Sequence, residues 1–169
     1  MRLLVSCPFG LSALLAKEIK KLCATTDKFS LLQTLDTAVI LKGNLEILYR
    51  LNLWSRIANK VYVMIGEGKI TTFDQLFQLI IALPWENYLP PTAQLSLQVV
   101  TKNSQLSSER TIQSVAHKAI LTALTQQSSV LSSSAEKFTI FLHLQENHLK
   151  VYLNTSGASL HQRGRRKQT

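Results

Sequence analysis

The order of helix and strand patterns in the first 67 residues limits the fold of this chain more than any other feature of the sequence. An apolar run suited to a buried strand precedes an amphipathic helical pattern. Two β-type runs joined by a turn follow, and then a second helix and a further strand. These six segments are residues 2–7, 10–24, 29–34, 37–42, 44–54 and 57–67. The β-α-β-β-α-β order predicts a ferredoxin-like half.

A second set of patterns follows in the order α-β-α-β-β, with no convincing internal repeat between the two sets. Its segments are residues 73–83, 95–101, 107–126, 137–144 and 149–153, with a polar loop at 128–134. Ser107 is the expected N-cap of the longest helix, because a serine hydroxyl can accept a hydrogen bond from a first-turn amide. Both halves are therefore expected to be α/β in class, as α+β sandwiches with helices packed on sheets.

Four aromatic residues near the ends of these segments have expected structural roles. We expect Trp54 to lie in the core at a helix end and Phe9 to anchor the first helix. Trp85 and Tyr88 are expected to pack at the junction between the two halves. An exposed Trp54 that stacks on a nucleobase is the alternative interpretation.

Composition excludes several classes of protein. The chain has 169 residues, of which 46% are hydrophobic, so a substantial core is expected. No apolar run reaches the ~18 residues of a membrane span, and two cysteines, Cys7 and Cys23, make no disulfide framework. Residues 4–7 (LVSC) resemble a lipoprotein cleavage box, but the apolar stretch that should precede it is missing. We therefore expect a cytoplasmic protein.

The charge balance points to an anionic partner. The net charge is +9, from 19 Lys and Arg against 10 Asp and Glu. The last acidic residue is Glu146, and the segment after it carries Lys150, Arg163, Arg165, Arg166 and Lys167. A basic tail alone is usually only solvated. Because residues 1–146 are basic as well, an anionic partner is the favoured interpretation.

The sequence lacks the motifs that would indicate catalysis or metal binding. Residues 66–69 (GEGK) miss the further glycine and hydroxyl residue of phosphate-binding loops, and are expected to form a simple turn. No nucleophile elbow or paired carboxylates appear. The four histidines have no zinc-ligand spacing with the cysteines, so no metal site is expected. The chain alone is not expected to be catalytic.

The segment between the strand at 95–101 and the long helix is the best candidate for anion binding. Helix N-termini offer free amides and the positive end of the helix dipole. The candidate residues in and after this segment are Lys102, Asn103, Ser104, Gln105, Arg110 and Lys118. An ordinary capped loop is the alternative, because every helix has an N-terminus. Arg56 is a further candidate for phosphate binding, unless it pairs with Glu46 or Glu67.

Several motifs resemble one family. They are residues 7–11 (CPFGL) with Leu14, Leu15 and Glu18, residues 39–43 (VILKG), 53–58 (LWSRIA), 102–105 (KNSQ), 153–157 (LNTSG) and 160–164 (LHQRG). Together they resemble the N-terminal region of the bacterial 23S rRNA guanine-N2-methyltransferases, a family also labelled N6-adenine-specific DNA methylases. The chain departs from the family pattern at Asn154, where Asp is usual, and at Arg165, where Tyr is usual.

This resemblance implies a domain plan. Residues 1–56 would form an N-terminal ferredoxin-like domain, residues 57–155 a THUMP domain, and residues 156–169 a basic linker, with the strand at 57–67 assignable to either half. A methyltransferase domain would begin just after residue 169. The chain would then be a truncation, a cloned domain or the product of a split gene. The parent would use S-adenosylmethionine to methylate a guanine of 23S rRNA, whereas no cofactor is expected in this chain itself.

The hypothesis from sequence is an RNA-binding THUMP module that positions structured 23S rRNA for a methyltransferase domain supplied in cis or in trans. The expected RNA-binding residues are Lys102, Asn103, Ser104, Gln105, Arg110, Lys118, Arg56, Arg163, Arg165 and Arg166. Two alternatives remain open. One is a protein-interaction adaptor that docks through exposed sheet edges, and the other is an enzyme with an unrecognised site.

Overall fold

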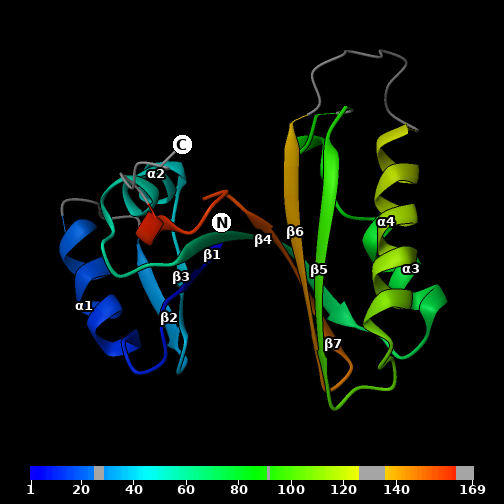
Figure 1. The fold of residues 1–169 in the computed structure, drawn as a ribbon, viewed down its shortest axis with the longest axis horizontal. Coiled ribbons are helices and arrows are strands. Elements are labelled where there is room, and N and C mark those ends of the chain that lie inside the picture. The colour runs from blue at the N-terminus through cyan, green and yellow to red at the C-terminus, as the bar shows by residue number, and fades with distance from the viewer. Residues whose placement is uncertain (25–28, 91, 126–135, 163–169) are drawn as a thin grey trace, which may run out of the picture. The chain divides into compact units, whose positions relative to one another are not determined.

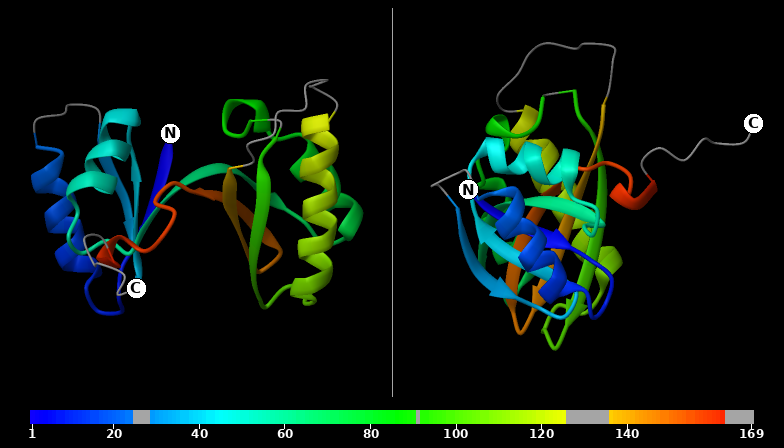
Figure 2. Two further views of the ribbon diagram at one scale, coloured as in Figure 1. Left: turned by 45° about the horizontal axis from the view of Figure 1, so that its top comes forward. Right: turned by 90° about the vertical axis from the view of Figure 1, so that its left-hand side faces the viewer.

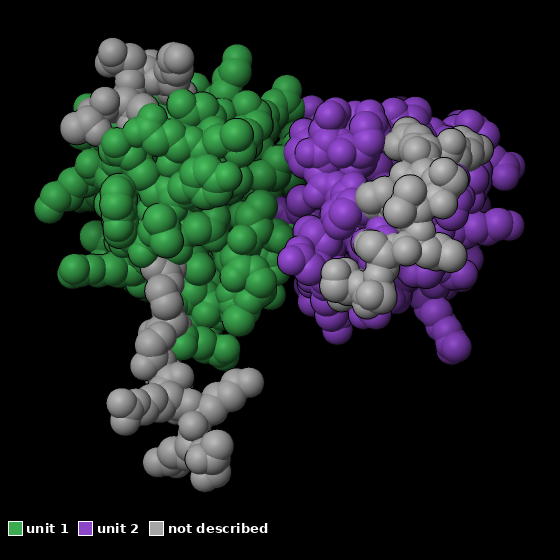
Figure 3. All heavy atoms as spheres, turned by 90° about the horizontal axis from the view of Figure 1, so that it is seen from above, with its two compact units in different colours: residues 1–64, 154–169 green, residues 65–153 purple. Residues whose placement is uncertain are grey.

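The chain folds into two compact units. The computed structural model describes residues 1–24, 29–90, 92–125 and 136–162. Unit 1 contains residues 1–64 and 154–169, and unit 2 contains residues 65–153 (Figure 3). Unit 2 is therefore inserted, in sequence, between two parts of unit 1.

The described residues of unit 1 form an antiparallel sheet with helices on one face (Figures 1 and 2). The strand order is β2-β3-β1-β4. The elements are β1 (Arg2–Ser6), α1 (Ser12–Leu22), β2 (Ser30–Thr34), β3 (Ala38–Lys42), α2 (Leu45–Trp54) and β4 (Lys60–Lys69). This order confirms the predicted ferredoxin-like half.

Alternation along the strands of unit 1 creates its core. Every second residue of β1 and β3 faces the helices, as the period of a strand requires. The fully buried residues are Leu3, Val5, Leu15, Ile19, Val39, Leu41, Ile47, Leu51 and Val61. Asn44 begins α2, because its side-chain oxygen accepts a hydrogen bond from the Ile47 amide at 3.0 Å.

Unit 2 places two helices against one face of its sheet (Figure 1). Its strands run in the order β7-β6-β5; β6 is parallel to β5 and antiparallel to β7. The elements are α3 (Phe73–Ile81), η1 (Trp85–Asn87), β5 (Gln94–Lys102), α4 (Glu109–Thr125), β6 (Lys137–Gln145) and β7 (His148–Asn154). The parallel pair needs a long crossover, which α4 supplies. The short helix η2 (Leu160–Gln162) follows β7.

Turn geometry sets the register of the hairpin between β6 and β7. Glu146 and Asn147 connect the strands with φ angles of 52° and 63°. Two consecutive positive φ values define the tight hairpin turn that matches the twist of paired strands. His143 therefore lies opposite Lys150, and Leu144 opposite Leu149.

The structure corrects the prediction of a turn at residues 66–69, which lie inside β4. A Cβ atom on Gly66 would lie 2.3 Å from the side chain of Leu83, and one on Gly68 would lie 2.3 Å from that of Leu79. The glycines therefore permit the α3 segment to pack closely on the strand.

Two aromatic residues expected in structural roles are exposed instead. Phe9 is 79% exposed, so it does not anchor the first helix. Trp54 is 57% exposed, because α2 ends at this residue and the chain turns into an extended conformation at Ser55. Trp85, in contrast, is fully buried in the core of unit 2, where its Nε1 donates to the carbonyl of Ile80 at 2.7 Å.

None of the described helices is both long and apolar enough to cross a membrane. The described residues also contain no group of three or more His, Cys, Asp or Glu placed to hold a metal ion. Cys7 and Cys23 are free and buried, and burial raises the pKa of both thiols. The predicted polar loop at 128–134 lies outside the described residues.

The N-cap of α4 is Ser108 rather than Ser107. The Ser108 hydroxyl accepts a hydrogen bond from the Thr111 amide at 3.4 Å, and its carbonyl accepts from the Ile112 amide. We expect Ser108→Ala to lower the free energy of unfolding by about 1 kcal/mol, measured by urea denaturation. Ser107→Ala is the matched control and should change stability by less than about 0.5 kcal/mol. An equal loss in both variants would contradict this assignment.

Candidate nucleic-acid interface

The loop after β5 is held in place by the turn between β6 and β7. Asn147 N donates to Ser104 Oγ at 3.0 Å, and Gln105 N donates to Asn147 Oδ1 at 2.8 Å. Glu146 N donates to the Lys102 carbonyl at 3.1 Å. Asn103 adopts a left-handed conformation with φ of 49°, which asparagine tolerates better than most residues. The predicted segment 102–105 is therefore a structured loop.

The loop after β5 and the first turn of α4 offer an anion fewer free amides than the sequence suggests. The Gln105 amide is bound by Asn147, and the Thr111 amide is bound by Ser108. Glu109, in this first turn, accepts a hydrogen bond from the Thr101 amide through Oε1 at 3.4 Å. A carboxylate here also offsets the positive end of the helix dipole. Exposed side chains, rather than these amides, are the groups that can meet an anion at this place.

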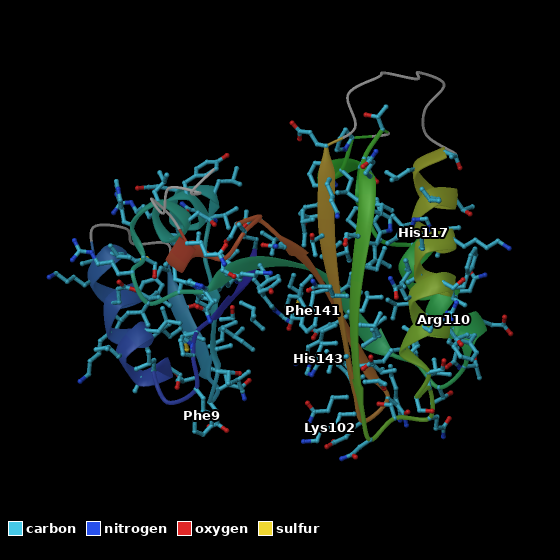
Figure 4. All side chains as sticks on the ribbon, viewed as in Figure 1. Phe9, Lys102, Arg110, His117, Phe141 and His143 are labelled. Carbon is cyan, nitrogen blue, oxygen red and sulfur yellow. The ribbon has the colours of Figure 1, made fainter. Side chains whose placement is uncertain are left out.

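Three predicted cations are exposed around this loop and along α4. Lys102 lies at the end of β5, and Arg110 and Lys118 lie on α4 (Figure 4 labels Lys102 and Arg110). No carboxylate in the described part of the chain forms a salt bridge with any of the three. Their positive charge is therefore available to an external anion.

Arg110 lines a shallow hollow between α4 and β5 with two residues that the sequence analysis did not select. Gln113 and His117 follow it at intervals of three and four residues, which places all three on one helix face. Figure 4 labels Arg110 and His117 on α4. The hollow has a volume of about 470 Å³. Gln113 Nε2 donates to the carbonyl of Leu97 at 3.2 Å, which fixes one wall. The spacing of the polar residues along α4 was the signal that could have identified them.

A further polar and aromatic row lies on the face of the unit 2 sheet opposite its helices. The ring of Phe141 stacks near that of His143 on the same strand, with centroids 6.1 Å apart and planes inclined by 16°. Lys150 lies directly opposite His143 on β7. Burial, and then the Lys150 ammonium, lower the pKa of His143, so the imidazole is predominantly neutral at pH 7.

The other predicted residues are Arg56 and the three arginines of the tail. Arg56 belongs to unit 1, whereas Lys102, Arg110 and Lys118 belong to unit 2. The backbone amide of Arg56 donates to Glu18 Oε1 at 2.9 Å, while Glu46, one of its expected partners, pairs with Arg50 at 2.6 Å. Arg163, Arg165 and Arg166 lie outside the described residues.

The motif at residues 154–157 joins the second segment of unit 1 to the first, residues 1–64. The Thr155 amide and hydroxyl both donate to the carbonyl of Val61, at 3.0 and 2.9 Å. Ser156 Oγ donates to Asn52 Oδ1 at 2.6 Å and accepts from the Val61 amide at 2.8 Å. Asn52 Nδ2 in turn donates to Thr155 Oγ1 at 3.1 Å. The motif that carried much of the resemblance is therefore a structural clamp.

Asn154, where the family usually has Asp, takes part in the same turn. Its Oδ1 accepts from the Ser156 amide at 3.0 Å, a bond that an aspartate could also accept. Its Nδ2 donates to the carbonyl of Gly157 at 3.0 Å, a bond that an ionised aspartate could not donate. The substitution is thus compatible with the turn.

The fold and the exposed basic surface define an α/β protein with a ferredoxin-like unit and a second unit of THUMP type. Residues 2–62 match the model for the RlmL ferredoxin-like domain, and residues 71–154 match the model for the THUMP domain. The chain belongs to the family that combines these two domains, as the sequence resemblance implied.

Relatives and solved structures agree with this family. The chain is 29% identical over 164 residues to the ribosomal RNA large subunit methyltransferase K/L of Cellvibrio japonicus, covering 95% of this chain and 21% of that protein. A Listeria monocytogenes protein predicted to be an N6-adenine-specific DNA methylase superposes with a TM-score of 0.86 at 32% identity, over 96% of this chain and 42% of that one. SMU.472, assigned as a methyltransferase and solved with SAH, superposes with a TM-score of 0.85 at 32% identity. The match covers 99% of this chain and 44% of that one. The chain thus spans less than half of each of these proteins.

Removing the Ser156 hydroxyl should weaken the clamp. Ser156→Ala removes the hydrogen-bond partner of the Val61 amide and of Asn52 Oδ1, so we expect a loss of about 1–3 kcal/mol in the free energy of unfolding. Urea denaturation followed by circular dichroism measures it. Ser159→Ala is the matched control, because the Ser159 hydroxyl makes no hydrogen bond with any residue that the structure describes. A Ser156→Ala variant as stable as this control would show that the clamp contributes nothing.

The environment of His143 predicts a low pKa. Because its folded-state pKa lies below the ordinary value of about 6.5, its contribution to stability is present above that pH and is lost as the pH falls. We expect an NMR titration of His143 to give a pKa below 6.5. Lys150→Gln should raise this pKa, because it removes the nearby positive charge, whereas Lys137→Gln should not. A His143 pKa at or above 6.5 would contradict the prediction.

Proposed function

We propose that this chain is an RNA-binding module that positions an rRNA substrate for an S-adenosylmethionine-dependent methyltransferase domain. The carrying observation is a set of exposed cations on the THUMP domain that form no salt bridge with any described residue: Lys102, Arg110 and Lys118. The names of the relatives, which include a ribosomal RNA large subunit methyltransferase, support RNA as the anionic partner. The net charge of +9 agrees with a polyanion.

The expected mode of binding is recognition of backbone and shape. Lys102 and Arg110 would contact phosphates, and Arg110 can do so with two parallel hydrogen bonds. Asn103, Ser104 and Gln105 would add neutral contacts to sugar and phosphate from the structured loop. Helical RNA hides its base edges in a deep, narrow groove, so such contacts read its shape and its 2′-hydroxyls more than its sequence.

The catalytic step would belong to a separate domain. That domain would bind the methyl donor S-adenosylmethionine and the guanine of 23S rRNA. This chain would bind other nucleotides of the RNA and thereby position the reacting guanine. SAH bound to SMU.472 supports S-adenosylmethionine as the donor in the parent protein. Arg56, Arg163, Arg165 and Arg166 would extend the contact beyond the THUMP domain. A cytoplasmic location would follow from the rRNA substrate.

Salt-dependent binding to a structured 23S rRNA fragment tests this proposal. Each phosphate contact contributes roughly one unit to the slope of log affinity against log salt. We therefore expect Lys102→Ala and Arg110→Ala each to weaken binding and to reduce this slope by about one unit. Fluorescence anisotropy of a labelled fragment over a range of salt concentrations measures both quantities.

Lys137→Ala is the matched control for Lys102→Ala. Lys137 is an exposed lysine of the same unit, but it begins β6 at the opposite end of the sheet from Lys102. A slope reduced equally by Lys137→Ala would mean that charge acts without a defined site. Unchanged affinity in both Lys102→Ala and Arg110→Ala would remove this surface from the RNA interface. Equal affinity for a DNA duplex of the same length would contradict RNA recognition.

A further inference from the structure

The strongest feature that the proposed function leaves unused is a groove in unit 1 between α1 and α2. It has a volume of about 760 Å³, within the range of sites that hold a small ligand. Its apolar lining residues include Leu14 and Leu22 of α1 and Leu53 and Trp54 of α2. The cations Lys17, Lys21 and Arg56 line the groove as well. The groove is therefore both apolar and basic.

Trp54 presents an unusual amount of aromatic surface for a residue in such a place. It is 57% exposed, whereas Trp85, the other tryptophan of the chain, is fully buried. The guanidinium carbon of Arg50 lies 5.8 Å from the centroid of the Trp54 ring, and Arg50 is itself held by Glu46 and by the carbonyl of Leu22. This cation–π contact helps to orient the indole without burying it.

The positive charge of the groove is not cancelled. Among the described residues Glu18 is the only carboxylate that lines it, and this carboxylate accepts hydrogen bonds from Ser55 Oγ at 2.6 Å and from the Arg56 amide at 2.9 Å. Lys17, Lys21 and Arg56 make no salt bridge with any described residue. Three cations against one carboxylate leave a site that favours an anion.

We propose that this groove binds an unpaired nucleotide segment of the RNA, with a base stacked on Trp54 and the flanking phosphates held by Lys17, Lys21 and Arg56. The inference rests on the proposed function, because it takes RNA as the partner. Tryptophan offers a flat apolar face on which any base can stack, and cations beside it match the phosphates that flank a base. The Ser55 hydroxyl is already bound to Glu18, so the site would select single-stranded RNA without a strong preference for one base.

The two tryptophans provide the assay. When tryptophan is excited in preference to tyrosine, both residues emit, and the emission of the exposed Trp54 should be quenched when the 169-residue chain binds an unstructured oligoribonucleotide of about ten nucleotides, while that of buried Trp85 should not respond. A blunt RNA duplex of the same length should quench it much less. We expect Trp54→Ala to weaken binding of the single strand by about 5- to 150-fold, the range for loss of one stacked base.

Trp54→Phe should retain part of the affinity, because it keeps an aromatic ring. Tyr49→Ala is the matched control: Tyr49 is 60% exposed on the same helix but does not line the groove, so its loss should leave binding unchanged. Lys17→Ala and Lys21→Ala should each reduce the slope of log affinity against log salt by about 0.7. Circular dichroism verifies that each variant is folded.

Three outcomes would overturn the inference. The first is that the oligoribonucleotide does not change Trp54 fluorescence and that Trp54→Ala binds it as tightly as the unsubstituted chain does. The second is an equal loss in Tyr49→Ala and Trp54→Ala, which would indicate an apolar docking face along α2. The third is equal quenching by an acidic peptide such as oligoglutamate, which would indicate a site for charge alone.

The failure of this inference and that of the proposed function can be told apart. If Lys102→Ala and Arg110→Ala weaken binding to the structured fragment while Trp54→Ala changes nothing, the groove is excluded and the RNA-binding function stands. If the Trp54 response persists in those two variants, the groove binds single strands independently of the THUMP surface, which supports the inference.

Discussion

The hydrogen bonds that join the 154–157 motif to the first segment of unit 1, residues 1–64, are the constraint on which the domain organisation depends. Unit 2 interrupts unit 1 in sequence, so the chain must leave through β4 and return at a defined point. Thr155 and Ser156 make that return by bonding both the amide and the carbonyl of Val61, and Asn52 closes the network from α2. Buried and half-buried polar groups are costly unless paired, so this network specifies where the chain rejoins unit 1.

The same principle separates structural polar groups from those available to a partner. In unit 2, Asn147 bonds Ser104 and the Gln105 amide, and Ser108 bonds the Thr111 amide, so the loop after β5 is rigid. In unit 1, Glu18 is held by Ser55 and the Arg56 amide. The candidate RNA-binding cations Lys102, Arg110, Lys118, Lys17, Lys21 and Arg56 are exposed side chains around these hydrogen-bonded frameworks. A hydrogen-bonded framework beneath exposed charges suits the recognition of a polyanion, because the backbone loses little conformational entropy on binding.

Much of the fold was predictable, since both sets of patterns have strong local signals. The period of the apolar residues identified the helices, and short β-type runs identified the strands. The errors have specific physical causes. Gly66 and Gly68 were predicted to form a turn because glycine favours turns, but Leu83 and Leu79 pack where their Cβ atoms would be. Trp54 was predicted to be buried because it is large and apolar, yet α2 ends at this residue.

The candidate site was predictable only in part. Sequence identified Lys102, Arg110 and Arg56 as candidate contacts, and the domain plan that the resemblance implied already assigned Arg56 to a different domain from the other two. Lys17 and Lys21 looked like the ordinary solvated face of an amphipathic helix. Their place in a groove with Trp54 depends on the packing of α1 beside α2.

The amino-acid sequence by itself determined the order of the elements, the family and the excess of positive charge, because these depend on local periodicity, motifs and composition. Tertiary structure decided the rest. The pairing of Thr155 and Ser156 with Val61 and Asn52 joins residues about a hundred positions apart, and the groove beside Trp54 joins two helices. Contacts at such separations arise only when the whole chain has folded, since no local pattern encodes which distant group will satisfy a hydrogen bond or cover an apolar face.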